Sequence, residues 1–69
     1  MEVHQLAEKA HHLMRIGRYD EAIDLYKKLL ESDSKNTTYL ENIGKMYYSL
    51  GRHEDAIAWY DKAVAIDQK

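Results

Sequence analysis

Apolar residues recur every three or four positions along four stretches of this chain. In the first stretch, polar residues separate Leu6, Ala10 and Leu13 and fall on the other faces, a spacing typical of an amphipathic α-helix. The four apolar stripes are, in order, Leu6, Ala10, Leu13 and Ile16; Ala22, Ile23, Tyr26, Leu29 and Leu30; Leu40, Ile43, Gly44, Tyr47 and Leu50; and Ala56, Ile57, Trp59, Tyr60, Ala63, Val64 and Ile66. The pattern predicts four helices, the first from Val3 to about Ile16 and the last from about His53 to Asp67.

A short motif that marks the turn between two helices occurs twice. Residues 17–23 read GRYDEAI, and residues 51–57, which lie 34 positions later, read GRHEDAI. Glycine easily takes the left-handed conformation that ends a helix, and acidic residues in a first turn favour the exposed N–H groups there. A repeat of this length is typical of helical solenoids. The sequence therefore predicts an all-α fold of two tandem helix-turn-helix hairpins, whose four antiparallel helices stack as a short right-handed α-solenoid.

The polar residues 32–36 link the two hairpins and leave the start of the third helix open. Thr38, followed three residues later by Glu41, resembles a capping box, whereas Asn36 or Thr37 would serve equally well as the N-cap. We therefore expect the third helix to begin directly after one of these three residues, Asn36, Thr37 or Thr38.

Gly44 lies inside the helical pattern of the third stretch, where glycine costs about 1 kcal/mol relative to alanine. Its counterpart in the first hairpin, Ala10, is also small, and so are Ala22 and Ala56 on the neighbouring helices. We therefore expect the two helices of each hairpin to approach closely at these positions.

The composition indicates one small, soluble domain spanning residues 1–69. The chain has 69 residues, no cysteine and a formal net charge of −2, and a globule of this size buries only about 60% of the surface of its unfolded chain. There is no signal-peptide pattern and no apolar run near the roughly 18 residues of a membrane span. The charges of both signs are scattered and form no basic stripe for phosphates. We expect a cytoplasmic protein with neither membrane nor nucleic-acid partners.

The chain resembles two tetratricopeptide repeats in register, one over residues 3–36 and one over residues 37–69. The first copy matches the family pattern at Leu6, Ala10, Leu13, Gly17, Tyr19, Ala22 and Tyr26, and the second at Leu40, Ile43, Gly44, Tyr47, Gly51, Ala56, Tyr60 and Ala63. Two features depart from the family pattern. Lys9 stands where leucine is usual, as a solvent-facing first helix would require, and Ser34 and Gln68 stand where proline is common.

The resemblance implies a protein–protein interaction scaffold that binds a peptide or a partner helix in a concave groove. The first helix of each repeat would line this groove. The groove positions are His4, Ala7, Glu8, His11 and Arg15 in the first repeat and Thr38, Glu41, Asn42, Lys45, Tyr48 and Ser49 in the second. One subset of the family holds the terminal carboxylate of a peptide, and Asn42 fits one place in that clamp. Ala7 and His11 do not supply its other residues, which argues against a carboxylate clamp.

The last helix supports an alternative function, self-association into a homo-oligomer or a helix-swapped assembly. Terminal repeats of a solenoid normally carry a polar cap, and such folds generally need about three repeats. Here Trp59, Ala63 and Ile66, together with the edge of Tyr60, are expected to leave an apolar strip on the fourth helix. Exposed apolar patches of this kind usually mark an interface.

No motif predicts catalysis, a cofactor or a metal site. The serines lack a neighbouring base, and the paired acids are explained by helix starts, so we do not expect an enzyme. His4, Glu8 and His12 share one face, but the two histidines are about 12 Å apart along the helix axis and cannot share one ion. We expect surface histidines, of which His11 would face the groove, where its protonation would tune the binding of an acidic partner.

Overall fold

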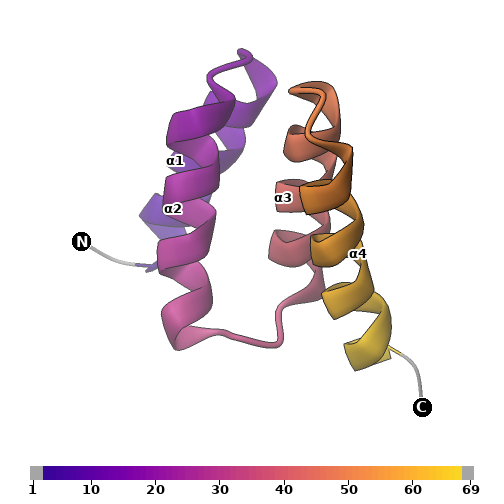
Figure 1. The fold of residues 1–69 in the computed structure, drawn as a ribbon. Coiled ribbons are helices and arrows are strands. Elements are labelled where there is room, and N and C mark those ends of the chain that lie inside the picture. The colour runs from indigo at the N-terminus through magenta and orange to yellow at the C-terminus, as the bar shows by residue number, and fades with distance from the viewer. Residues whose placement is uncertain (1–2, 68–69) are drawn as a thin grey trace.

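The structure is a computed structural model that describes residues 3–67, and it consists of four α-helices (Figure 1). They are α1 (Val3–Arg15), α2 (Tyr19–Ser32), α3 (Thr37–Ser49) and α4 (His53–Asp67). Helices α1 and α2 form one hairpin, α3 and α4 form a second, and α2 packs against α3. Residues 3–67 contain no β-strand. The predicted all-α fold of two helical hairpins is confirmed.

Both hairpin turns have the same glycine-based helix ending, and they lie at the same end of the molecule (Figure 1). Gly17 has φ 86° and Gly51 has φ 80°, in the region that favours glycine. The N–H group of Arg18 donates to the carbonyl of Leu13 at 2.9 Å, and the N–H of Arg52 donates to the carbonyl of Tyr47 at 2.9 Å. These bonds satisfy carbonyl groups that a helix end would otherwise leave without a partner. The role predicted for the two glycines is confirmed.

Asn36 caps the N-terminus of α3. Its side-chain oxygen accepts a hydrogen bond from the backbone N–H of Tyr39 at 3.1 Å, and its amide group donates to the carboxylate of Asp33 at 3.0 Å. This finding selects one of the three possible N-caps. The alternative of a capping box between Thr38 and Glu41 is wrong, because Thr38 already lies inside the helix.

Gly44 faces the ring of Tyr60 across the second hairpin. A Cβ atom added at Gly44 would lie 3.1 Å from Cε1 of Tyr60 and 3.2 Å from Cδ1, closer than carbon atoms normally approach without strain. In the first hairpin the equivalent Ala10 is fully buried, as is Ala22 on the neighbouring helix. The predicted close approach is confirmed for the second hairpin at Gly44.

One hydrophobic core extends through both hairpins. It includes Leu13 of α1, Ile23 of α2 and Ile43 of α3. Four residues of the apolar stripes are exposed instead, namely Ile16 at 53%, Leu50 at 41%, Ile57 at 59% and Val64 at 57%. Ile16 and Leu50 each follow the last residue of a helix, so the chain has begun to turn and the side chain no longer points toward the neighbouring helix.

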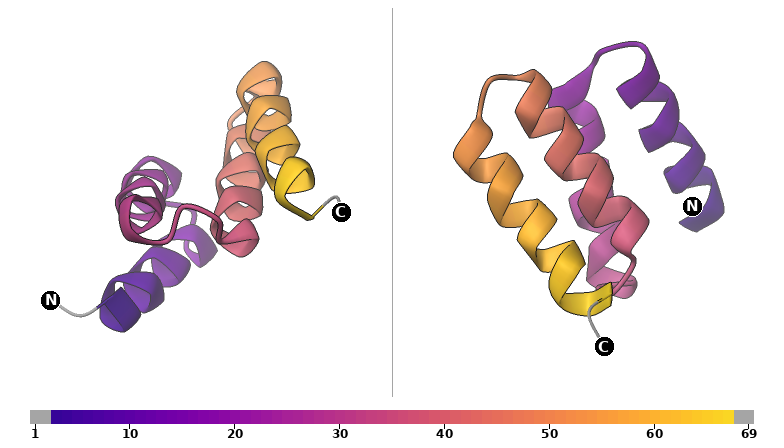
Figure 2. Two further views of the ribbon diagram at one scale, coloured as in Figure 1. Left: turned by 90° about the horizontal axis from the view of Figure 1, so that it is seen from below. Right: turned by 90° about the vertical axis from the view of Figure 1, so that its right-hand side faces the viewer.

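Side-chain hydrogen bonds join the hairpins between α2 and α3. The amide of Asn42 donates to the hydroxyl of Tyr26 at 3.2 Å, and the ammonium of Lys27 donates to the hydroxyl of Tyr47 at 2.9 Å. Tyr26 also packs on Tyr39, with ring centroids 5.5 Å apart. The view from below in Figure 2 shows the two hairpins set at an angle to each other, with α2 and α3 at their junction.

Candidate partner-binding surfaces

The groove residues predicted on α1 lie together around a shallow hollow. The hollow is lined by His4, Ala7, Glu8, His11, His12 and Arg15. The imidazole Nε2 of His4 lies 3.2 Å from a carboxylate oxygen of Glu8, and both side chains are largely exposed. His12 was not among the predicted groove residues. Its place four positions after Glu8, one helical turn away on the same face, is the signal that would have included it.

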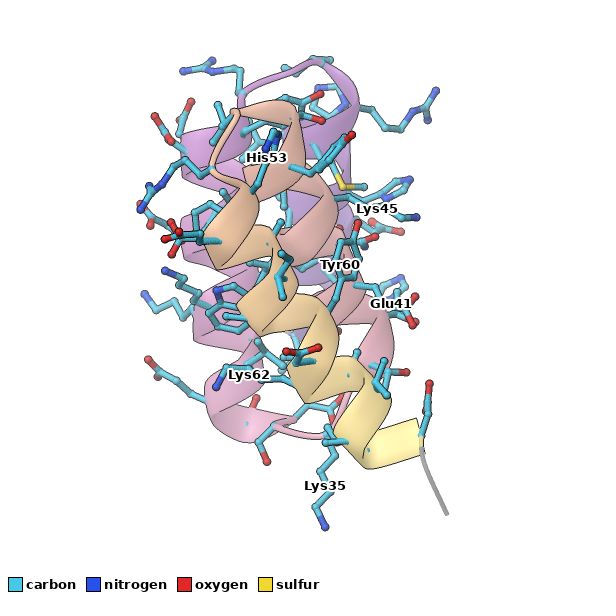
Figure 3. All side chains as sticks on the ribbon, turned by 45° about the vertical axis from the view of Figure 1, so that its right-hand side comes forward. Lys35, Glu41, Lys45, His53, Tyr60 and Lys62 are labelled. Carbon is cyan, nitrogen blue, oxygen red and sulfur yellow. The ribbon has the colours of Figure 1, made fainter. Side chains whose placement is uncertain are left out.

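The groove residues predicted on α3 form a second row of side chains. Thr38, Lys45, Tyr48 and Ser49 are exposed. Tyr48 is 63% exposed, and its ring stacks on His53 of α4 with centroids 4.9 Å apart. Figure 3 shows the side chains of Glu41, Lys45 and Tyr60 on the same side of the second hairpin, whereas Lys62 extends on the opposite side.

Asn42 is the predicted groove residue most involved in the fold itself. It is half-buried, and its amide group is engaged by Tyr26. Removing one partner of such a hydrogen bond typically costs about 1 kcal/mol or more. A substitution at Asn42 would therefore change stability together with any effect on binding, and Lys45 and Tyr48 are the cleaner probes of this face.

The apolar surface of α4 differs from the strip that the sequence predicted. Ala63 is only 2% exposed, and Trp59, Tyr60 and Ile66 are half-buried. The expectation that Ala63 is exposed on this strip is therefore wrong, because α4 turns that side toward α3. The side chains that do face outward are Ile57 at 59% and Val64 at 57% exposed.

Trp59 is covered in part by two lysines. The ammonium of Lys27 lies 5.5 Å from the centroid of its ring, and that of Lys62 lies 5.4 Å away. Cations over an aromatic face are attracted by the ring quadrupole, by about 0.5–1 kcal/mol at exposed sites. These contacts explain why Trp59 is not a free apolar anchor on α4.

Burial raises the pKa of two tyrosines above the usual value of 10.0. For Tyr60, the negative charge of Glu41 and the nearby Tyr48 raise the pKa further. For Tyr26, the hydrogen bond from Asn42 lowers the pKa and thereby offsets part of the effect of burial. Both hydroxyl groups therefore favour the neutral form in the folded chain.

We expect the free energy of unfolding to fall as the pH rises above about 10. The pKa of each tyrosine is higher in the folded state than in the unfolded state. The contribution of its neutral hydroxyl to the free energy of unfolding is therefore fully present below the unfolded pKa and is lost as the pH rises through the folded pKa. Urea denaturation at several pH values between about 9 and 12 would measure the slope. Tyr26→Phe and Tyr60→Phe should each flatten this slope relative to the unsubstituted chain. An equal slope in all variants would contradict the prediction.

Residues 3–67 contain no group of three or more histidine, aspartate or glutamate side chains arranged to hold a metal ion. Within the same residues, no helix has the length and apolar character that crossing a membrane requires. Neither observation adds a further candidate site to the two surfaces described above.

The two repeated hairpins and their exposed first-helix residues define a helical-repeat protein. A model of the tetratricopeptide repeat family matches residues 8–69. The chain therefore belongs to the tetratricopeptide repeat family, as the pattern of the two hairpins predicted. Members of this family are in general protein–protein interaction modules, and the repeat is a non-enzymatic type of scaffold.

Two curated proteins are similar in sequence to part of this chain. It is 33% identical over 60 residues to the photosystem I assembly protein Ycf3 of Prochlorococcus marinus, a match that covers 77% of this chain and 35% of that protein. It is 36% identical over 45 residues to tetratricopeptide repeat protein 8 of Caenorhabditis elegans, covering 65% of this chain and 9% of that protein. The chain thus spans about a third or less of the length of these relatives.

Proposed function

We propose that this chain binds a peptide or a partner helix along the face formed by its two first helices. This first-helix face consists of His4, Ala7, Glu8, His11 and Arg15 on α1 and Thr38, Glu41, Asn42, Lys45, Tyr48 and Ser49 on α3. The observation that supports the proposal most strongly is Tyr48, a large aromatic side chain that is 63% exposed among polar neighbours. Exposed tyrosines flanked by polar groups are typical anchors of protein interfaces.

The charges on this face favour a partner of defined polarity. Helices α1 and α3 run in the same direction toward the turn end of the molecule (Figure 1). Arg15 and Lys45 lie nearer that end, whereas Glu8 and Glu41 lie farther from it along the same helices. Complementary charges orient a partner more than they strengthen its binding. The expected partner therefore has an acidic residue near the turn end and a basic residue about one to two helical turns away.

The relatives support a role in binding other proteins. The name of the Prochlorococcus relative describes an assembly protein, and assembly depends on contacts with other polypeptides. Only the general role is carried over to this chain, because it matches 35% of that relative.

A peptide library displayed on phage would test the first-helix face. We expect selected peptides to lose about tenfold or more in affinity when Lys45→Glu or Tyr48→Ala is introduced. Lys28→Glu makes the same charge change at an exposed position of α2, outside the proposed face, and should leave the affinity nearly unchanged. Melting temperatures of all three variants should stay near that of the unsubstituted chain. Equal losses for Lys45→Glu and Lys28→Glu would refute the assignment.

Self-association through α4 is a second candidate. The partly exposed edges of Trp59, Tyr60 and Ile66 favour it and would form the contact. Light scattering over a concentration series measures it directly. A constant monomer mass at all concentrations would remove this candidate.

A further inference from the structure

The outer side of α4 repeats a surface that is covered elsewhere in the same chain. Ile57 and Val64 occupy the places that Ile23 and Leu30 occupy 34 residues earlier on α2. Ile23 is 3% exposed and belongs to the core together with Ile43 of α3, whereas Ile57 is 59% exposed. The chain itself therefore shows what covers this kind of surface, namely an amphipathic helix packed as α3 packs on α2.

The charge in the middle of this surface differs between the two helices. On α2, Lys27 donates a hydrogen bond to the hydroxyl of Tyr47 at 2.9 Å. Asp61 stands at the equivalent place on α4, between Ile57 and Val64, and it is exposed. We name Ile57, Asp61 and Val64 the outer strip of α4. A helix covering the outer strip would need a basic residue where α3 has Tyr47, since a carboxylate accepts hydrogen bonds and pairs with a cation.

A second copy of the chain fits the outer strip poorly when it docks through α1. The face of α1 equivalent to the α2-facing side of α3 carries Lys9 and His12 in place of Ile43 and Met46. Ile43 is fully buried and Met46 is 1% exposed. The same seating would bury the ammonium of Lys9 in an apolar contact, which is strongly unfavourable.

A second copy docking through its own α4 meets a different obstacle. A two-fold pairing of antiparallel helices centred on the outer strip brings the middle residue of one copy opposite the same residue of the other. That residue is Asp61, and two carboxylates placed in this way repel each other.

We propose that the outer strip of α4 binds an amphipathic helix of a partner protein that carries apolar residues on either side of a lysine or arginine. The apolar residues cover Ile57 and Val64, and the cation pairs with the carboxylate of Asp61. The partner helix lies on α4 as α3 lies on α2. This surface is separate from the first-helix face, so the two can be tested independently.

The test uses a peptide copied from this chain. It comprises residues 36–50 with Tyr47→Lys and carries a fluorescent label. Short peptides form helices only weakly in water, so a hydrocarbon link joins positions 45 and 49, both of which are exposed in the chain. Fluorescence anisotropy measures its binding to the full chain, and we expect saturable binding.

Two substitutions on the outer strip should weaken the binding of the peptide, and a matched substitution elsewhere should not. Ile57→Glu and Val64→Glu are each expected to weaken binding by about tenfold or more, because a charge replaces the apolar contact. Ile16→Glu makes the same chemical change at another apolar residue, which is 53% exposed, and should leave the affinity unchanged. Because Ile57 and Ile16 are both exposed, neither change should unfold the chain, and circular dichroism melting verifies this.

A charge exchange tests the role of Asp61. Asp61→Lys should lower the affinity for the peptide that carries Tyr47→Lys by about fivefold. It should raise the affinity for a second peptide, which carries Tyr47→Glu instead, by a similar factor. Absence of binding, or binding that ignores both Ile57→Glu and Asp61→Lys, would overturn the proposal. Sedimentation that shows a dimer abolished by Ile57→Glu would overturn it in favour of a second copy as the occupant.

Discussion

Replacing Ile23 with alanine is expected to lower the free energy of unfolding by about 2–4 kcal/mol. Ile23 is 3% exposed and packs within the core that joins α2 to α3. The substitution removes three buried carbon atoms and leaves a cavity that the neighbouring helices fill only in part. Because small domains have a total stability of about 5–15 kcal/mol, this single change would remove a large share of the stability of the chain. Urea denaturation, with the midpoint and the slope both fitted, measures the loss.

Ile57→Ala is the matched control for Ile23→Ala. The two isoleucines occupy the same position in the two repeats, and the chemical change is identical, but Ile57 is 59% exposed. Its substitution should change the free energy of unfolding by less than about 0.5 kcal/mol. Equal losses at both positions would mean that Ile57 is buried in solution, as it would be in an oligomer. In that case the loss for Ile57→Ala should shrink as the protein is diluted, whereas the loss for Ile23→Ala should stay the same.

The elements that local chemistry determines were predictable from the sequence. The two turns require a left-handed backbone conformation, which glycine adopts readily because it has no side chain. The positions of Gly17 and Gly51 therefore predicted the turns. Gly44 was predictable for a related reason, since a glycine inside a helix is costly unless another group needs the space. The space is taken by the ring of Tyr60.

The start of α3 shows where such local reasoning stops. Asn36, Thr37 and Thr38 are adjacent and all can act as N-caps. The choice falls on Asn36 because its amide also bonds to Asp33. This second bond depends on how the link folds back, which no periodicity in the sequence describes.

The surface of α4 was harder to predict, because apolar residues lie on nearly all of its sides. Trp59, Ala63, Ile57 and Val64 cannot be sorted into inner and outer faces by a helical period alone. The 34-residue shift does contain the information, since Ile57 corresponds to the residue of α2 that the next helix covers. The hydrogen bond between Asn42 and Tyr26 carried no comparable signal, because it depends on the packing of one hairpin against the other.

Replacing Gly44 with leucine should also destabilise the chain, by about 2 kcal/mol after the gain in helix propensity of roughly 1 kcal/mol is subtracted. Even the first added carbon would lie 3.1 Å from the ring of Tyr60, and the leucine side chain adds three more. The ring would have to move outward, and α3 and α4 would separate. Thermal or urea unfolding measures the effect, and Ser49→Leu on the exposed side of α3 provides the control for leucine itself.

A double variant identifies the obstacle. If the Tyr60 ring is what excludes leucine, Gly44→Leu should cost much less in a Tyr60→Ala background, with a coupling free energy of about 1–3 kcal/mol. Additive losses would place the strain elsewhere in the second hairpin.

The position of Tyr60 also bears on binding. Tyr60 belongs to α4, but it lies beside Glu41, which is part of the first-helix face (Figure 3). A ring displaced by Gly44→Leu should therefore alter peptide binding at that face, whereas the outer strip of α4 should still bind its helix.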